Sequence, residues 1–542
     1  MDSIVRFPCD EGAILHGADA VPCPAAARRW TLLAAILGSS MAFIDGTVAN
    51  VALPAIQRDL NANASEAQWV IESYALFLAA LLLVGGMLGD RFGRRRIFML
   101  GVALFSAASL ACALSHSAAA LIGWRAVQGM GAALLVPGSL SLISAAFPES
   151  ERGRAIGTWS AFSGITAALG PVLGGFLVDR YAWPWAFMVN VPIGLALLVL
   201  CALKVPESRG MAAGDKVDVA GAILATVALA GIVFAFIEAP LRGWSARAVW
   251  GALLLGGVGL ALFVRAEARA ASPMLPLPLF RVRAFAGANL LTLLLYAALG
   301  GGLYFLPLNL IQVQGYGATA AGAALLPFIA IMFALSRWAG KLVDTHGARL
   351  PLVVGPLVAA AGFALFAVPS VGGRYWQTFL PAVCVLGLGM TITVAPLTTT
   401  VMNAVGVELA GVASGVNNAV SRTAGLIAVA VFGMLMAQVF DAALGARLSE
   451  LRLPPELLGT LEQQRHRLAG ITLANDLDPA TAAVVRRAIG DAFVAGFRGI
   501  MLVCAALALL SALSAGLLME GRAAGAARIR PGLDDPARDR EP

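Results

Sequence analysis

The chain is 542 residues long, with 59% hydrophobic residues, 13% charged residues and a mean hydropathy of +0.83. Soluble domains carry about a quarter charged residues, so this composition excludes an ordinary soluble protein and indicates an integral membrane protein. The net charge of +7 does not indicate a nucleic-acid partner, because the arginines stand between apolar stretches, as orientation signals do. The six cysteines form no CxxC or CxxH spacing, and so neither a disulfide framework nor a zinc site is expected.

In chain order, the sequence contains fourteen apolar runs long enough to cross a bilayer, for which a helix needs about 20 residues. The first residues contain no long apolar run, and we expect no cleaved signal peptide there. Residues 438–494 form the one long polar connection. The expected spans of this all-α membrane protein are 30–54, 68–89, 97–115, 119–142, 154–178, 186–203, 218–237, 248–266, 285–311, 319–340, 350–368, 377–402, 410–437 and 495–519.

A short basic motif follows the second span and recurs in reduced form after the tenth. Residues 86–95 and 340–349 both read Gly-x3-Asp-x2-Gly-x-Arg. A motif repeated between hydrophobic segments is typical of a duplicated bundle of membrane helices. We expect each copy to anchor the cytoplasmic side and to act as a gate. The candidate gate residues are Gly86, Asp90, Arg91, Gly93, Arg94 and Arg95 in the first copy and Gly340, Asp344, Gly347 and Arg349 in the second.

The basic residues of the short loops give an orientation. If the N-terminus is cytoplasmic, most of these arginines and lysines fall on the cytoplasmic side, as the positive-inside rule requires. The long segment 438–494 then lies outside the cell, and an even number of spans returns the C-terminus to the cytoplasm. The sequence therefore predicts a bacterial inner-membrane protein with both termini cytoplasmic.

Several motifs in a fixed order resemble those of one transporter family. They are Asp45-Gly-Thr-Val-Ala-Asn50-Val-Ala-Leu-Pro54, Gln68-Trp69-Val70, the hairpin 86–96, Arg125-Ala-Val-Gln128-Gly129-Met-Gly131 and Trp183-Pro-Trp185-Ala-Phe187-Met-Val-Asn190-Val-Pro192-Ile-Gly194. This order is similar to that of the fourteen-helix drug:proton antiporters of the major facilitator superfamily, the QacA/EmrB type. The resemblance is dense over residues 30–205 and continues in layout to residue 519.

The resemblance implies a major facilitator fold, with two six-helix bundles and two inserted helices between them. The expected division is a cytoplasmic segment 1–29, a first bundle 30–203, a linker 204–284 with the inserted pair, a second bundle 285–519 and a cytoplasmic tail 520–542. We expect the inserted pair to pack at the periphery of the bundles.

The resemblance also implies proton-coupled export of amphipathic or cationic small molecules, that is, multidrug efflux by alternating access. A narrow exporter of one metabolite or antibiotic, an importer on the same fold and, remotely, a membrane sensor remain alternatives. The expected partners are the small-molecule substrate, protons and the lipid bilayer, with a periplasmic adaptor and an outer-membrane channel in a Gram-negative cell.

The motifs of common enzymes do not occur in the sequence. There is no GxxxxGK[ST], HExxH or GxSxG pattern, so we expect neither ATP hydrolysis nor a catalytic residue. The four histidines lie mostly in loops and offer little for a metal site. No cofactor is expected.

Three charged residues within the expected spans are candidates for proton coupling. An acid inside the membrane is costly and usually functional, and this points to Asp45 in the first span and Glu72 in the second. The resemblance implies a coupling role for Arg125 in the fourth span, and the two acids could exchange this permanently charged partner as a proton arrives. The alternatives are a helix-packing Asp45 and a static buried ion pair.

The fifth span carries small residues and a proline. Gly164, Gly170, Pro171, Gly174 and Gly175 permit close helix approach and a kink, and the resemblance implies an antiporter motif that seals one face of the cavity. Ordinary helix packing explains the pattern equally well. Asn417, Asn418 and Arg422 in the thirteenth span are interpreted as polar contacts between membrane helices.

Overall fold

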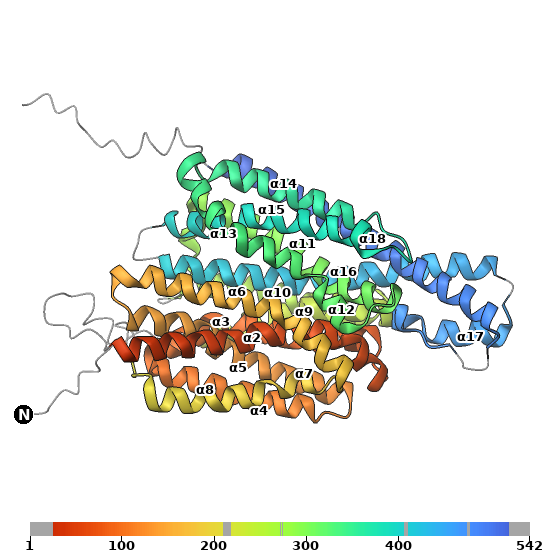
Figure 1. Cartoon of the computed structure of the whole chain (residues 1–542), viewed down its shortest axis with the longest axis horizontal. Helices are drawn as coiled ribbons and strands as arrows, with labels where there is room; N and C mark the ends of the chain where they lie inside the picture. The colour runs from red at the N-terminus through yellow and green to blue at the C-terminus, as the bar shows by residue number, and fades with distance from the viewer. Residues whose placement is uncertain are drawn as a thin grey trace, which may run out of the picture.

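The protein is an all-helical bundle over the part of the chain that the structure, a computed structural model, describes. This part comprises residues 25–209, 218–270, 273, 275–405, 410–451, 453–473 and 477–519. Its long helices run along one direction (Figure 1). Thirteen of them are long and apolar enough to cross a membrane. A fourteenth, α6, is 32 residues long and runs beside them. The expected fold class, an all-α membrane protein, is confirmed. The expected cytoplasmic tail 520–542 and residues 1–24 of the expected N-terminal segment lie outside the described residues.

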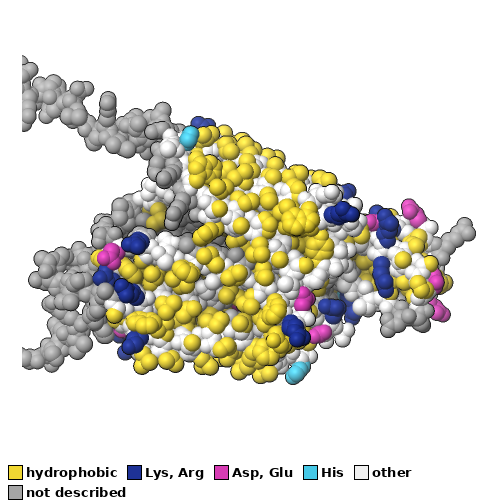
Figure 2. Space-filling view, in the orientation of Figure 1, with side chains coloured by type: hydrophobic (Ala, Val, Ile, Leu, Met, Phe, Trp, Pro, Cys, Tyr) yellow, Lys and Arg dark blue, Asp and Glu magenta, His cyan; other side chains and the backbone are white. Residues whose placement is uncertain are grey.

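The surface shows the band expected of a membrane protein. Figure 2 shows hydrophobic side chains over the middle of the bundle, with charged side chains gathered towards its two ends. The inserted helix α10 (Arg247–Glu267) exposes large apolar side chains, among them Trp250 and Leu254. A contiguous apolar surface of this kind marks contact with lipid.

The first half of the bundle has six spans, the sixth of which is divided between α7 and α8. Asn63 and Glu66 start α3 with a reciprocal capping box, in which each side chain bonds to the other residue's backbone at 2.9 Å;. The helices are α2 (Ala25–Asp59), α3 (Ala64–Phe92), α4 (Arg94–Ala113), α5 (Ala118–Ala146), α6 (Glu149–Arg180), α7 (Trp185–Met188) and α8 (Asn190–Lys204).

The two inserted helices are α9 (Val219–Arg242) and α10 (Arg247–Glu267). Only α10 packs at the periphery. α9 instead covers the seam, which is the interface between the two halves, and its Val233 and Ile237 pack with Leu76 of α3 and Leu426 of α16. Glu238 of α9 accepts hydrogen bonds from Ser65 and Trp69 of α3 at 2.8 and 3.3 Å. This polar contact fixes α9 against the first half.

The second half also has six spans, two of them divided by a break. Its elements are η1 (Leu277–Arg281), α11 (Arg283–Leu308), the π-helical η2 (Asn309–Val313), α12 (Ala318–Ala323), α13 (Leu326–His346), α14 (Arg349–Phe366), α15 (Tyr375–Asn403), α16 (Ala410–Glu450), α17 (Pro455–Gln463), η4 (Arg465–Gly470) and α18 (Pro479–Leu518).

The predicted polar connection 438–494 is mostly helical, which corrects the sequence-based boundaries. α16 continues to Glu450 and α18 begins at Pro479, where Asp478 caps its first turn. The two helices project beyond the rest of the bundle and carry the cap segment, residues 453–473, between them (Figure 1). We call this the cap end and the opposite end, where α2 begins and α18 finishes, the terminal end. Apolar composition located the spans but not the helical extensions, because a polar helix can continue past the bilayer.

The two halves are inclined to each other and meet near the cap end (Figure 1). There Gln312 donates a hydrogen bond to Gln57 of α2 at 2.9 Å. Asp179, in the last turn of α6, accepts bonds from the backbone N–H groups of Ala318 and Thr319 at 3.1 and 2.8 Å. It thereby caps α12 of the opposite half. These contacts close the seam at the cap end.

Candidate functional site

A buried ion pair lies at the centre of the first half. Arg125 of α5 donates from Nη1 to Oδ2 of Asp45 on α2. The two side chains are each only 1% exposed. Burying two charges is costly unless their remaining donors and acceptors are also satisfied, so the surrounding contacts decide whether this arrangement is stable.

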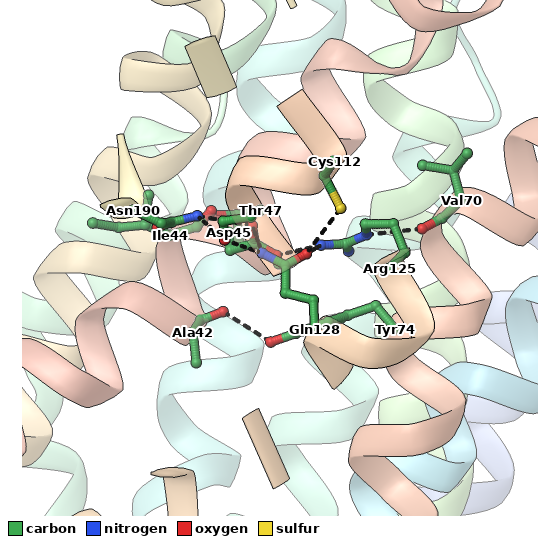
Figure 3. Close-up of polar contacts among 12 residues, drawn as sticks. Ala42, Ile44, Asp45, Thr47, Val70, Tyr74, Cys112, Arg125, Gln128 and Asn190 are labelled. Atoms are coloured by element: carbon green, nitrogen blue, oxygen red, sulfur yellow. Dashed lines mark hydrogen bonds and ion pairs between the residues drawn. The ribbon is translucent and has the colours of Figure 1, made fainter. Parts of the chain in front are cut away.

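The other carboxylate oxygen of Asp45 is held by two amides. Gln128 donates to Oδ1 at 2.8 Å and Asn190, the first residue of α8, at 3.0 Å. Figure 3 shows Arg125 and Gln128 of α5 and Asn190 of α8 converging on Asp45. Ser109 of α4 accepts a further bond from Gln128 at 2.7 Å. Every contact to the Asp45 side chain comes from a donor, an arrangement that suits the ionised carboxylate.

The guanidinium of Arg125 has partners besides Asp45. It donates to the backbone carbonyl of Val70 at 3.0 Å and to Oε1 of Gln128 at 2.6 Å. Its charge lies over the rings of Tyr74 and Phe187, with 4.3 and 5.5 Å to their centroids;. Arg125 and Gln128 share one face of α5, because residues three apart are neighbours on a helix.

Glu72 lies apart from this network. Its side chain is 1% exposed, and its Oε2 has no hydrogen-bond partner among the described residues. It lies near Tyr304 in α11 of the second half. The structure therefore joins Asp45 with Arg125 and places Glu72 towards the seam, and the exchange of partners expected when a proton arrives stays a prediction.

The first hairpin turns at Gly93, whose φ of +112° is a conformation that side chains disfavour;. Glu207, which follows α8, accepts bonds from the backbone N–H groups of Arg95 and Arg96 at 2.9 and 3.2 Å. A carboxylate at this position complements the positive end of the α4 dipole. Arg94 donates to Asp90 at 2.8 Å. Glycine is therefore required at position 93 for two reasons. Its φ is disfavoured for other residues, and a β-carbon there would lie 2.9 Å from the Glu207 carboxylate carbon.

The second hairpin repeats the turn, and the described residues show no carboxylate at the N-terminus of α14. Gly347 separates α13 from α14 with a φ of +75°. Arg349 donates to the backbone carbonyl of Gly516, in the last turn of α18, at 2.6 Å. The equivalent arginine of the first copy, Arg95, donates to the carbonyl of Val205 directly after α8, at 3.0 Å. In each half, the last arginine of the motif thus bonds to the end of the sixth span. Asp344 lies within α13, and its side chain is outside the described residues.

The small residues of the fifth span lie against two different helices. Gly170 and Gly174 approach α2 at Thr47 and Val48. Gly175 approaches the backbone of Ala318 in α12, and Gly322 of that helix approaches the carbonyl of Pro171. This motif therefore packs the first half onto the second near the cap end. Gly164 lies in α6, and the residues around its position are only partly described.

Comparisons with known proteins agree with this architecture. A family model described as Major Facilitator Superfamily matches residues 35–429. The chain is 34% identical to the tetracenomycin C resistance and export protein of Streptomyces glaucescens, over 90% of each chain. It is 37% identical to the multidrug resistance protein Stp of Mycobacterium tuberculosis, over 88% of this chain and 89% of that protein. The chain belongs to the Major Facilitator Superfamily.

A solved member of similar fold is a bacterial homologue of the human lysosomal transporter Spinster. It superimposes with a TM-score of 0.63 at 17% sequence identity, covering 91% of this chain and 97% of that one. At this identity the similarity supports the fold alone. The family and the fold indicate a transporter and not an enzyme.

Four residues of the described site were not assigned a role from the sequence. Gln128 and Asn190 stood inside recognised motifs, and their polar side chains within apolar runs were the available signal. Ser109 resembles any small residue of a membrane helix, so no signal marked it. Glu207 lies in a charged loop, and only the fold brings it to the N-terminus of α4.

Proposed function

We propose that this protein is a proton-coupled antiporter that exports amphipathic small molecules by alternating access. The observation that carries the proposal is the buried Asp45–Arg125 pair in a chain of the Major Facilitator Superfamily. An ionisable residue at membrane depth is by default a site for ions or protons. Both relatives are resistance proteins and the one from Streptomyces glaucescens is an export protein, which supports export as the direction of transport.

Asp45 is the proposed proton carrier. When a proton binds, the carboxylate loses its charge and releases Arg125 Nη1, while Arg125 keeps its acceptors on Val70 and Gln128. The guanidinium therefore remains satisfied without moving far. What changes is the attraction between α2 and α5, and both helices belong to the half that must rock during transport. Protonation would thus bias one conformation over the other.

The terminal end is the proposed cytoplasmic side, since the basic hairpins and both ends of the described chain lie there. The cap segment would then lie outside the cell, and the conformation described here is closed to the outside by the Gln57–Gln312 and Asp179–Thr319 contacts. A cysteine at position 460 should react with an impermeant reagent in intact cells, whereas one at position 525 should not. The opposite labelling pattern would reverse the orientation.

Purified protein in liposomes tests the energy source. With an imposed pH difference and no ATP, it should accumulate an amphipathic dye against its gradient and should stop when the pH and electrical gradients are collapsed. Asp45→Asn in the same liposomes is the matched control. Accumulation that requires ATP, or that survives the loss of both gradients, would exclude the proposal.

A further inference from the structure

A second arginine lies at membrane depth without an acidic partner. Arg422 of α16 is partly exposed, and in the described residues no hydrogen bond or ion pair holds it. Its guanidinium lies over the ring of Phe43, 5.7 Å from the centroid. Phe43 belongs to α2 of the opposite half and stands two positions before Asp45. Arg422 therefore spans the seam between the halves.

The expected contact between helices is present for Arg422 as a cation–π contact with Phe43, but not as a hydrogen bond. Its neighbour Asn417 does form hydrogen bonds, because it donates to Asn289 at 3.1 Å and to Thr292 at 2.7 Å on α11. Arg422 has no such bond. Arginines within membrane spans face the bundle interior or a water-filled cavity, since exposure to lipid is too costly. A partly exposed Arg422 at the seam therefore faces solvent between the halves.

The surroundings of Arg422 are aromatic. Tyr74 in the first half and Tyr296 in the second lie near its guanidinium. Gly425, nearly one turn further along α16, leaves open space where a side chain would stand. A guanidinium can pair with a carboxylate and stack on an aromatic face at the same time. These residues thus present a cation and aromatic rings to a ligand that enters the seam.

Among the described residues, no acid forms an ion pair with Arg422. Asp45 is engaged by Arg125, Gln128 and Asn190. Glu72 is buried and bonds to neither Asp45 nor Arg422. The guanidinium of Arg422 therefore keeps its donors available in the described part of the seam, and it would attract an anion.

We infer that Arg422 and Phe43 form a substrate-recognition site for aromatic anions, such as aromatic carboxylates and phenolates. This inference rests on the proposed export function. It narrows the amphipathic substrates to anionic ones and so departs from the expected preference for cationic compounds. An anion would place its charge on the free guanidinium and its ring beside Phe43. An inside-negative membrane potential would then assist its release from the cell.

Two dyes with the same xanthene ring test the charge preference. Fluorescein is an anion, and rhodamine 6G is a cationic ester. Binding of each dye to the purified full chain in detergent is measured by fluorescence anisotropy, without any gradient. Wild-type protein should bind fluorescein more tightly. Arg422→Gln should weaken fluorescein binding about tenfold or more, as expected for loss of a charge-assisted contact, and should leave rhodamine binding equal or stronger.

Two further variants separate recognition from structure. Arg447→Gln removes the same charge from the same helix, but at an exposed ion pair with Asp491, and should change neither affinity. Arg422→Lys keeps the charge but not the planar group, and so should retain part of the preference for fluorescein. If Arg422→Gln does not fold, the lysine variant and Phe43→Leu still report the ratio of the two affinities.

Several results would overturn the inference. They are tighter binding of rhodamine 6G by the wild type, no binding of either dye, or equal weakening of both dyes by Arg422→Gln, which a structural arginine would produce. Because binding is measured without a gradient, it does not depend on proton coupling. Anion-selective binding without proton-driven transport would refute the proposed function and leave this site standing.

Discussion

The two halves of the protein bury different kinds of polar side chain. In the spans of the first half, Asp45, Glu72 and Arg125 are at most 1% exposed. In the described spans of the second half, the buried polar residues are uncharged, as in the Asn289–Thr292 pair that bonds to Asn417. Over the described residues, the two halves therefore share their helical architecture but differ in the charge of their buried side chains. This difference favours the first half as the location of the proposed proton site.

The two hairpins show the same division between shared and specific contacts. Arg95 and Arg349 are equivalent in the repeated motif, and each bonds to a backbone carbonyl at the end of the sixth span of its half. Glu207 has no counterpart among the described contacts of the second hairpin. The arginine contact is therefore common to both halves, and the contact with Glu207 is described for the first half.

The largest effect is expected from Asp45→Asn. The amide keeps the size of the side chain but cannot carry a proton, so uphill export should be lost while exchange down a gradient partly remains. Removing one partner of a buried ion pair costs about 3–5 kcal/mol, so thermal stability should fall as well. Dye accumulation in liposomes and the unfolding midpoint in detergent measure the two effects.

Two variants separate coupling from stability at this site. Asp45→Asn combined with Arg125→Gln removes the stranded charge, and so it should recover stability but not uphill export. Asn417→Leu, in the uncharged cluster of the second half, should lower stability and leave the dependence on the proton gradient intact. Full proton-driven export by Asp45→Asn at matched expression would remove the coupling role from this half and direct attention to Glu72.

Substitution of the two turn glycines should have smaller effects on stability, and the two effects should differ in size. Gly347→Ala places a side chain at a φ of +75°, at a cost of about 1–2 kcal/mol for a left-handed conformation;. Gly93→Ala meets a φ of +112° and, in addition, the Glu207 carboxylate. It should therefore lower the unfolding midpoint further than Gly347→Ala. Adding Glu207→Ala should relieve part of the Gly93→Ala loss, and the absence of any relief would show that Glu207 does not constrain this turn.

The sequence predicted the fold more fully than the site, for physical reasons. Apolar runs and the repeated motif report burial in the membrane directly, so the spans and the duplication were evident. The pairing of Asp45 with Arg125 was also accessible, because both charges fall at membrane depth. The positions of Glu207, of α9 over the seam and of Arg422 on Phe43 depend on contacts between distant segments, which hydropathy does not encode.

The smallest effects should come from Arg95→Gln and Arg349→Gln. Each removes one charge-assisted bond to a carbonyl from a partly exposed or exposed side chain, so each should lower stability by about 1 kcal/mol or less. Arg95 also lies 3.9 Å from Glu207, a separation at which the ion pair adds little stability.

If each arginine only stabilises its own half, the two variants should shift the unfolding midpoint by similar amounts. Their transport rates should then stay near those of the wild type. A gate predicts a different result, because opening and closing would depend on the arginine. Loss of transport in Arg95→Gln at an unchanged unfolding midpoint, with normal transport in Arg349→Gln, would show that the first hairpin gates and that the second only anchors.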